Sequence, residues 1–297
     1  MAEALLIFKP ELWSRTIQKN LDVITGMRKH SDYSFAEEIK YGKRLHITKL
    51  GDTQVRNYTQ GVDITFDDVD GTEQVLIIDQ QRYFGKYYDD IDKRQAIPGA
   101  VEQDMAETAK ALALDADEFV SARLYQAVVA SGSVIGKSAN AIDLDSLSSQ
   151  PKQEKAVLEA VEEGLVHLYN NNVTPQTEIW GEFSPKFYSK FRIYLTELAT
   201  NNLDLLKRGI IGKYGQVNVC IENRLPVASG TKYNFLRTGK AFAYAEQIDK
   251  VAKTDKEKGF GTYFKGLLVY GGRVVRPEEI FAILETTSEA DSAWIAR

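Results

Sequence analysis

The sequence predicts an α+β protein, and three stretches carry this prediction. Residues 98–131 show an uninterrupted helical pattern, residues 43–79 alternate like a two-stranded β-ribbon, and helix and strand signals mix after residue 150. A long helix, a ribbon and a mixed region together define an α+β fold. With 297 residues, the chain is long enough for one large domain or two of ordinary size.

The helix predicted over residues 98–131 is the longest element. Pro98 suits a first helical turn, because its missing N–H would be unpaired there anyway. Apolar side chains recur at steps of three and four and form one stripe, whose expected core positions are Met105, Leu112, Phe119 and Leu124. At 1.5 Å per residue the helix would span about 50 Å and could act as a strut. Periodicity alone fits an ordinary core helix equally well.

Residues 1–40 are predicted to form an arm. Leu12, Ile17, Leu21 and Ile24 give a weak helical signal, and the polar stretch RKHSDYS follows them. An arm with so little core of its own must be fixed by something else, for which a neighbouring subunit is one candidate.

The ribbon predicted over residues 43–79 is long and polar. Its first strand alternates around Leu45 and Ile47, and its return begins at the apolar run 75–78. Between them lies the acidic, turn-prone stretch VDITFDDVDG. Because an isolated two-stranded ribbon is marginal in water, we expect this one to lie on another surface.

The rest of the chain is predicted from shorter signals. Residues 132–151 are rich in Ser, Gly and Asn and mark the best internal boundary. The other expected elements are an aromatic strand at 83–88, a helix at 157–168, a strand at 177–183, a helix from Ser184-Pro185, a strand at 217–221, a hairpin at 233–244, a charge-dense loop or helix end at 249–258 and strands at 263–282.

Composition restricts the class of protein. The net charge of −5 and pI of about 5.5 oppose a protein whose main task is to grip phosphate, though not one that merely encloses nucleic acid. A single cysteine, Cys220, cannot form an internal disulfide and fits a reducing cytoplasm. The N-terminus does not read as a secretory signal and no window is apolar enough to span a bilayer, so no membrane partner is expected.

No residue pattern predicts catalysis, a metal or a cofactor. His30, His46 and His167 have no partner at metal-ligand spacing; we expect His46 on the solvent face of a strand and His167 at a helix edge. Cys220 lies within an apolar strand pattern and is interpreted as a small buried hydrophobe. No glycine-rich nucleotide loop is present in the sequence.

Two acidic clusters are interpreted as structural. Asp63, Asp67, Asp68 and Asp70 invite a calcium site, but Phe66 and Ile77 occupy the first and last ligand positions that an EF-hand loop requires. A solvated turn is the expected alternative. Asp89, Asp90 and Asp92 could supply a catalytic carboxylate pair, but acidic residues before a helix N-terminus need no catalytic explanation.

The order of these features resembles the major capsid proteins of tailed bacteriophages, which have the Hong Kong 97-type fold. The resemblance spreads over most of the chain and is carried by KPELWS, KYGKRLHITKLGDTQVRNYTQ, VLIIDQQRYFGKYYDDIDKRQA, GQVNVCIENRLP and KGLLVYGGRVVRPEEIFAIL. It implies an N-terminal arm (1–40), an extended β-hairpin loop (41–79), a peripheral domain with the long spine helix (80–149 and 261–276) and an axial α/β domain (150–260 and 277–297).

The resemblance also implies a function. Family members assemble as pentamers and hexamers into an icosahedral shell around double-stranded DNA, so we expect a structural, non-enzymatic virion protein that is assembled in the host bacterial cytoplasm. The early start of the ribbon and helix favours a separate scaffolding protein, beside a portal. The alternatives are an encapsulin-type nanocompartment shell, a DNA-binding module, and a cytoplasmic hydrolase using Asp89, Asp90 or Asp92.

The extended loop of the family reaches a neighbouring subunit. The candidates for contacts between subunits are therefore the acidic turn residues Asp63, Asp67, Asp68 and Asp70, together with Trp13 of KPELWS. Lys110, Arg123 and the basic residues of 250–258 are candidates to face the acidic turn.

Overall fold

The computed structural model describes residues 26–50, 55–57, 60, 63, 71–90, 100–130, 134–144, 150–197, 212–256 and 259–286. Five candidate residues for contacts between subunits or for catalysis lie outside these ranges: Trp13, Asp67, Asp68, Asp70 and Asp92. Within them the chain mixes helices with antiparallel and parallel strands, which confirms the predicted α+β class.

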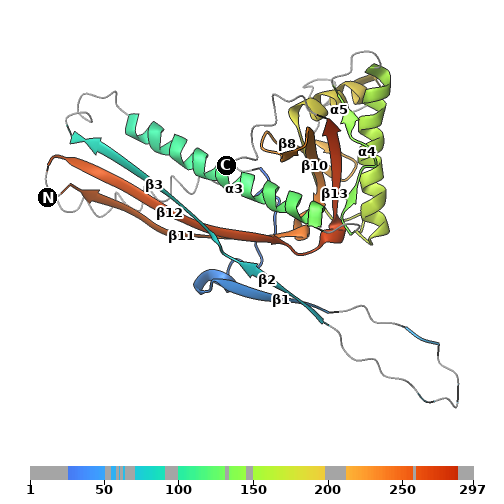
Figure 1. The fold of residues 1–297 in the computed structure, drawn as a ribbon, viewed down its shortest axis with the longest axis horizontal. Helices are drawn as coiled ribbons and strands as arrows, with labels where there is room; N and C mark the ends of the chain where they lie inside the picture. Colours follow the sequence, from blue (N-terminus) through green and yellow to red (C-terminus); the bar gives the residue numbers. More distant parts are fainter. Residues whose placement is uncertain are drawn as a thin grey trace.

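One layer of the protein is a long helix lying along a three-stranded antiparallel sheet (Figure 1). The helix, α3 (Ala100–Ala130), matches the predicted stretch 98–131, and the sheet has the order β11 (Phe242–Asp255), β12 (Gly261–Val274), β3 (Gln80–Asp89). Fourteen extended residues and 31 helical residues both span about 45 Å, so the helix covers one sheet face along its length.

The apolar stripe of α3 packs on this sheet. Leu124 is buried in a cluster with Tyr244 and Tyr270, and Met105 is buried nearer the other end, beside Phe264. Two further stripe positions, Leu112 and Phe119, are partly buried against the same clusters, with the Phe119 ring edge-on to Tyr270 at 5.2 Å between centroids.

A compact α/β unit forms the second layer. Its sheet has eight strands. Six of them follow one another in the spatial order β4 (Gly136–Lys137), β13 (Ile280–Thr286), β10 (Thr231–Thr238), β6 (Ile179–Phe183), β8 (Val217–Ile221) and β7 (Lys213–Tyr214). The other two pair beside this path, β5 (Ile142–Asp143) with β13 and β9 (Val227–Ala228) with β10. Two helices, α4 (Gln150–Asn170) and α5 (Pro185–Glu197), pack against it. The predicted start of α5 is confirmed, because Ser184 Oγ accepts the N–H of Phe187 at 3.1 Å.

Strands β10 and β13 join the two layers. On β10, Leu236 points into the core formed with α4 and α5, while its neighbour Phe235 points into the core formed with α3. On β13, Phe281 and Ala282 divide in the same way. Since successive strand residues face opposite sides, one sheet serves both cores.

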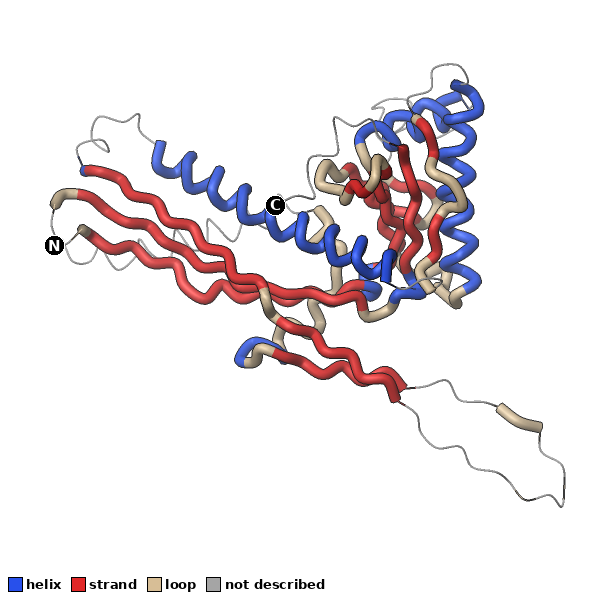
Figure 2. Tube along the Cα trace, in the orientation of Figure 1, coloured by secondary structure: helices blue, strands red, loops and turns tan. Residues whose placement is uncertain are grey.

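The ribbon projects from this body (Figure 2). Its strands, β1 (Arg44–Leu50) and β2 (Gly71–Ile77), are antiparallel, with Arg44 opposite Ile77 and Leu50 opposite Gly71. Its base packs on the body through buried Leu76, beside the short 3₁₀ helix η1 (Glu38–Tyr41). His46 is exposed and contacts Glu73, as expected for a solvent-facing position.

Two sequence expectations are wrong. Residues 242–255, expected partly as a loop or helix end within the 150–260 unit, instead form β11 and pair with β12. Because β11 is an edge strand, charged residues such as Lys253 and Asp255 reach the surface without leaving the sheet, so charge density did not mark a loop. Residues 136–143, expected with the long helix, pair in parallel with β13.

Candidate functional site

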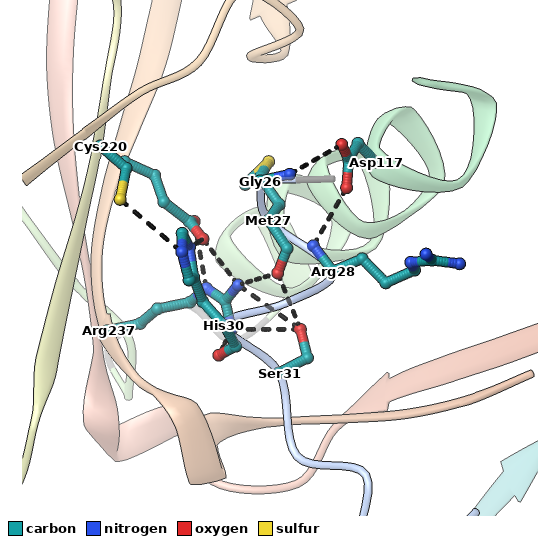
Figure 3. Close-up of polar contacts among 9 residues, drawn as sticks. Gly26, Met27, Arg28, His30, Ser31, Asp117, Cys220 and Arg237 are labelled. Atoms are coloured by element: carbon teal, nitrogen blue, oxygen red, sulfur yellow. Dashed lines mark hydrogen bonds and ion pairs between the residues drawn. The ribbon is translucent and has the colours of Figure 1, made fainter. Parts of the chain in front are cut away.

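A polar junction lies where residues 26–31 cross between the two layers. We call residues 26–31, with Asp117, Glu182, Cys220, Glu222 and Arg237, the arm junction. Figure 3 labels Asp117, Cys220 and Arg237 of this group beside the arriving segment. Met27 and Arg28 are at most 1% exposed, and His30 and Ser31 are buried as well. The predicted arm, residues 1–40, is expected from the sequence to have little core of its own, but its residues 26–31 are fixed by contacts within the same chain.

Arg237 connects the junction to the compact unit. Its guanidinium, fully buried on β10, donates from Nη2 to Oε1 of Glu182 at 2.7 Å and from Nε to Oε2 at 3.1 Å. It also donates to the carbonyl oxygens of Met27, at 2.8 Å, and His30, at 3.1 Å. The planar fork of arginine suits this two-sided task, so one side chain binds β6 to the arriving segment.

Glu182 is held ionised by these partners. Burial by itself would raise the pKa of this carboxyl, but Arg237 and the hydrogen bond from His30 outweigh burial and lower it. His30 stacks on Trp180 with 3.9 Å between ring centroids and places Nδ1 3.3 Å from Glu182 Oε1. Glu182 and Arg237 therefore form a buried, hydrogen-bonded ion pair, to which His30 adds a further contact.

Asp117 connects the junction to α3. Its two carboxylate oxygens accept the backbone N–H groups of Gly26, at 3.2 Å, and Arg28, at 3.0 Å. Burial raises the pKa of Asp117 in spite of these hydrogen bonds. Glu222, just after β8, has its pKa raised to about 8, first by burial and then by the nearby charges of Asp117 and Glu182.

Three side chains of the junction line up like a nucleophile, base and acid. Cys220 Sγ lies 3.6 Å from His30 Nε2, and His30 Nδ1 lies next to Glu182. However, burial, followed by Glu182 and Glu222, raises the pKa of the Cys220 thiol to about 11. A thiol that stays protonated at neutral pH is a poor nucleophile, so this geometry supports a structural role.

The residues that the sequence named as candidates are scattered. Asp63 is exposed on the outer part of the ribbon, and Lys110 is exposed on α3. Arg123 donates a hydrogen bond from Nη2 to Oδ2 of Asp79 in its own chain at 2.6 Å, so its guanidinium already has an acidic partner. Asp89 accepts the hydroxyl of Tyr87 at the end of β3. In the described ranges, no group of three or more His, Cys, Asp or Glu is arranged to hold a metal ion.

None of the described helices is long and apolar enough to cross a membrane.

Comparisons with known proteins address the fold. No protein-family model matches the sequence, and no curated protein does. Among solved structures, one from Mycobacterium phage Che8 superposes with a TM-score of 0.69 at 21% identity, over 87% of this chain and 90% of the other. The capsid of the cyanophage P-SCSP1u gives 0.62 at 17%, over 87% and 86%. The mature capsid of bacteriophage PhiM1 gives 0.63 at 13%, over 89% and 87%.

The chain therefore has the Hong Kong 97-type capsid fold that the order of its sequence features implied. At identities of 13–21%, this likeness shows the fold.

Proposed function

We propose that the chain is a major capsid protein that self-assembles, as pentamers and hexamers, into the icosahedral shell enclosing the double-stranded DNA of a tailed phage. The observation that carries this proposal is a likeness to capsid structures that covers almost nine-tenths of both chains. A likeness of this extent favours a protein built for the same architecture over an enzyme that shares one domain with it.

The ribbon supports self-assembly by its shape. It leaves the body in Figure 1 and carries exposed residues beyond β1 and β2, with Val55 96% exposed. The sequence between β1 and β2 includes Asp63, Asp67, Asp68 and Asp70 and is negatively charged. In our proposal these residues contact basic groups of an adjacent subunit.

Exposed aromatic side chains at the far end of the three-stranded sheet also support self-assembly. Phe260 is 81% exposed and its carbonyl oxygen accepts the Tyr87 hydroxyl, and Tyr87 and Tyr263 lie beside each other with 5.0 Å between ring centroids. We call these three residues the aromatic end. Exposed aromatic clusters are typical of protein interfaces, so we assign this end to contacts between subunits.

In a capsid protein of this fold, each layer of the chain has a role. α3 and the three-stranded sheet form the peripheral domain, the unit containing α4 and α5 forms the axial domain, and residues 1–40 form the arm. The protein is a virion component without enzymatic activity, assembled in the host cytoplasm with a separate scaffolding protein and a portal. With a net charge of −5, its contacts with DNA are sparse and independent of sequence.

Electron microscopy of the purified chain tests this function. We expect closed shells built of five- and six-membered rings, and a chain that stays monomeric at high concentration, with or without its scaffolding protein, would contradict the proposal. The contents of particles purified from infected cells separate the two shell functions. Nuclease-protected DNA supports a capsid, whereas a protein cargo would identify a nanocompartment.

A further inference from the structure

Glu222 lies directly against the backbone of the arm junction. A Cβ placed on Gly26 would come within 1.5 Å of Glu222 Oε1, so only glycine leaves room for this carboxyl group. The N–H of Met27 donates to Glu222, while the N–H groups of Gly26 and Arg28 donate to Asp117. Three consecutive backbone N–H groups therefore donate to two carboxyl groups, one on α3 and one just after β8.

The positive charges nearby are already engaged. Arg237 makes both of its short ionic hydrogen bonds to Glu182, and Arg28 contacts Glu246 on β11. If Glu222 were ionised, the charge of Asp117 would repel it in a largely buried place. Charged groups that are buried and close to like charges are expected to hold a proton.

We propose that Glu222 makes the arm junction a proton-operated clamp on the N-terminal arm. When Glu222 is protonated, residues 26–31 are held between α3 and β8. When it ionises, repulsion from Asp117 and Glu182 loosens the segment at its Gly26 end. The clamp is a property of the single chain and does not depend on the shell function.

The direction of the pH effect follows from the groups around Glu222. These are Asp117 on α3, Glu182 on β6, Cys220 on β8, Arg237 on β10 and, from the segment itself, Arg28 and His30 with Glu246 of β11 behind them. The pKa of Glu222 is about 8 in the closed clamp against 4.5 in water. Its stabilising effect is therefore complete below the lower value and is lost as pH rises through about 8.

Three neighbouring groups do not oppose this direction between about pH 6 and pH 9. Asp117 also has a raised pKa and acts in the same direction as Glu222. Glu182 has a lowered pKa, so its contribution is lost only as pH falls through the acidic range. The thiol of Cys220, with a pKa of about 11, stays neutral throughout. The clamp is thus tightest in mildly acidic solution.

Hydrogen exchange of the amides of residues 26–31, corrected for the intrinsic rate at each pH, tests the clamp. Protection in the wild-type chain should fall by up to about 100-fold between about pH 6 and pH 9, because opening is linked to one ionisation. Glu222→Gln, which keeps the shape of the protonated group, should stay protected at both values. Gly26→Ala should lose protection at both, because its Cβ displaces the carboxyl group.

Glu73→Gln provides the matched control, because it makes the same chemical change on the exposed ribbon and should retain the wild-type pH dependence. Wild-type protection that does not change with pH would overturn the clamp. If E222Q lost as much protection as the wild type between the two pH values, the clamp would also be overturned, because the titrating group would then be a different one. If E222Q does not fold, the wild-type curve decides on its own: protection should stop falling above about pH 8, and protection that levels off far from that value contradicts the proposal. Imaging of shells is independent of all these readings, so the clamp and the shell function can fail separately.

Discussion

Charged groups at the arm junction and on the ribbon have different surroundings. Arg237 and Glu182 are both fully buried and bonded to each other, whereas His46 and Glu73 contact each other on the ribbon with 59% of each side chain exposed. Removing one partner of a buried ion pair strongly destabilises the folded protein, because the other charge is left buried and unpaired. An exposed ion pair contributes little to stability and is screened by salt. The junction thus connects the chain to itself, and the ribbon leaves charge available to other molecules.

The sharpest way to break this comparison is to remove the buried arginine. Arg237→Met should lower the free energy of unfolding by about 3–5 kcal/mol, because Glu182 and two carbonyl oxygens lose their donor. Urea denaturation measures the loss. Replacing Glu182 by Met as well should recover part of it, since no uncompensated charge then remains.

Arg224→Met is the matched control for that experiment. Arg224 donates to Glu118 at 2.7 Å, but Glu118 is 43% exposed, so the change should cost up to about 1 kcal/mol. Equal losses at Arg224 and Arg237 would mean that burial does not distinguish the two pairs.

The helix beneath the junction gives the next effect. Leu124→Ala should cost about 2–5 kcal/mol, because this side chain is fully buried against the long sheet. Phe119→Ala should cost less, since its ring is only partly buried, and Ile77→Ala on the ribbon should cost under about 0.5 kcal/mol. Thermal unfolding of the three variants ranks them, and a larger loss for Ile77 than for Leu124 would reverse the comparison.

The helix and the ribbon could be predicted from the sequence because their signals are local. A stripe at steps of three and four indicates a helix, and alternation over a few residues indicates a strand. The packing of α3 on the sheet follows from the same stripe, since Leu124 and Met105 lie where the periodicity puts them.

The junction could not be predicted, because its partners lie far apart along the chain. Arg28 and Asp117 are 89 residues apart, and Glu182 and Arg237 are 55 apart. A weaker signal was present: Arg237 follows Phe235 and Leu236 in an apolar strand, and Glu182 stands next to Phe183. Two opposite charges at inward strand positions are expected to pair, but local periodicity cannot show which elements meet.

Removing the outer ribbon should separate stability from assembly. Replacing residues 52–69 by a short Gly-Ser turn leaves both β1 and β2 intact and removes side chains that, where described, are exposed. The free energy of unfolding should change by less than about 0.5 kcal/mol, while closed shells are lost. Urea titration and electron microscopy of the same preparation give both readings. Shells of normal shape from this variant would show that the ribbon is not needed for closure.

The smallest expected effect concerns the charge of the outer ribbon. Changing Asp63, Asp67, Asp68 and Asp70 to Asn should lower the yield of shells and weaken its dependence on salt. Each exposed ion pair contributes at most about 1 kcal/mol, but the contribution is repeated in every subunit of a shell. Lys110 and the basic residues of 250–258 remain the candidate partners, while Arg123 already donates to Asp79 within its own chain.

A second quadruple variant separates local charge from net charge. Glu107, Glu159, Glu163 and Glu178 are exposed on the body, and changing all four to Gln removes the same number of negative charges from the net −5. If both variants alter the salt dependence of assembly equally, net charge alone is responsible. If only the ribbon variant does so, the acidic residues contact a positively charged surface of another subunit. If neither does, the outer ribbon is a solvated turn, and its contribution to the shell comes from shape instead of charge.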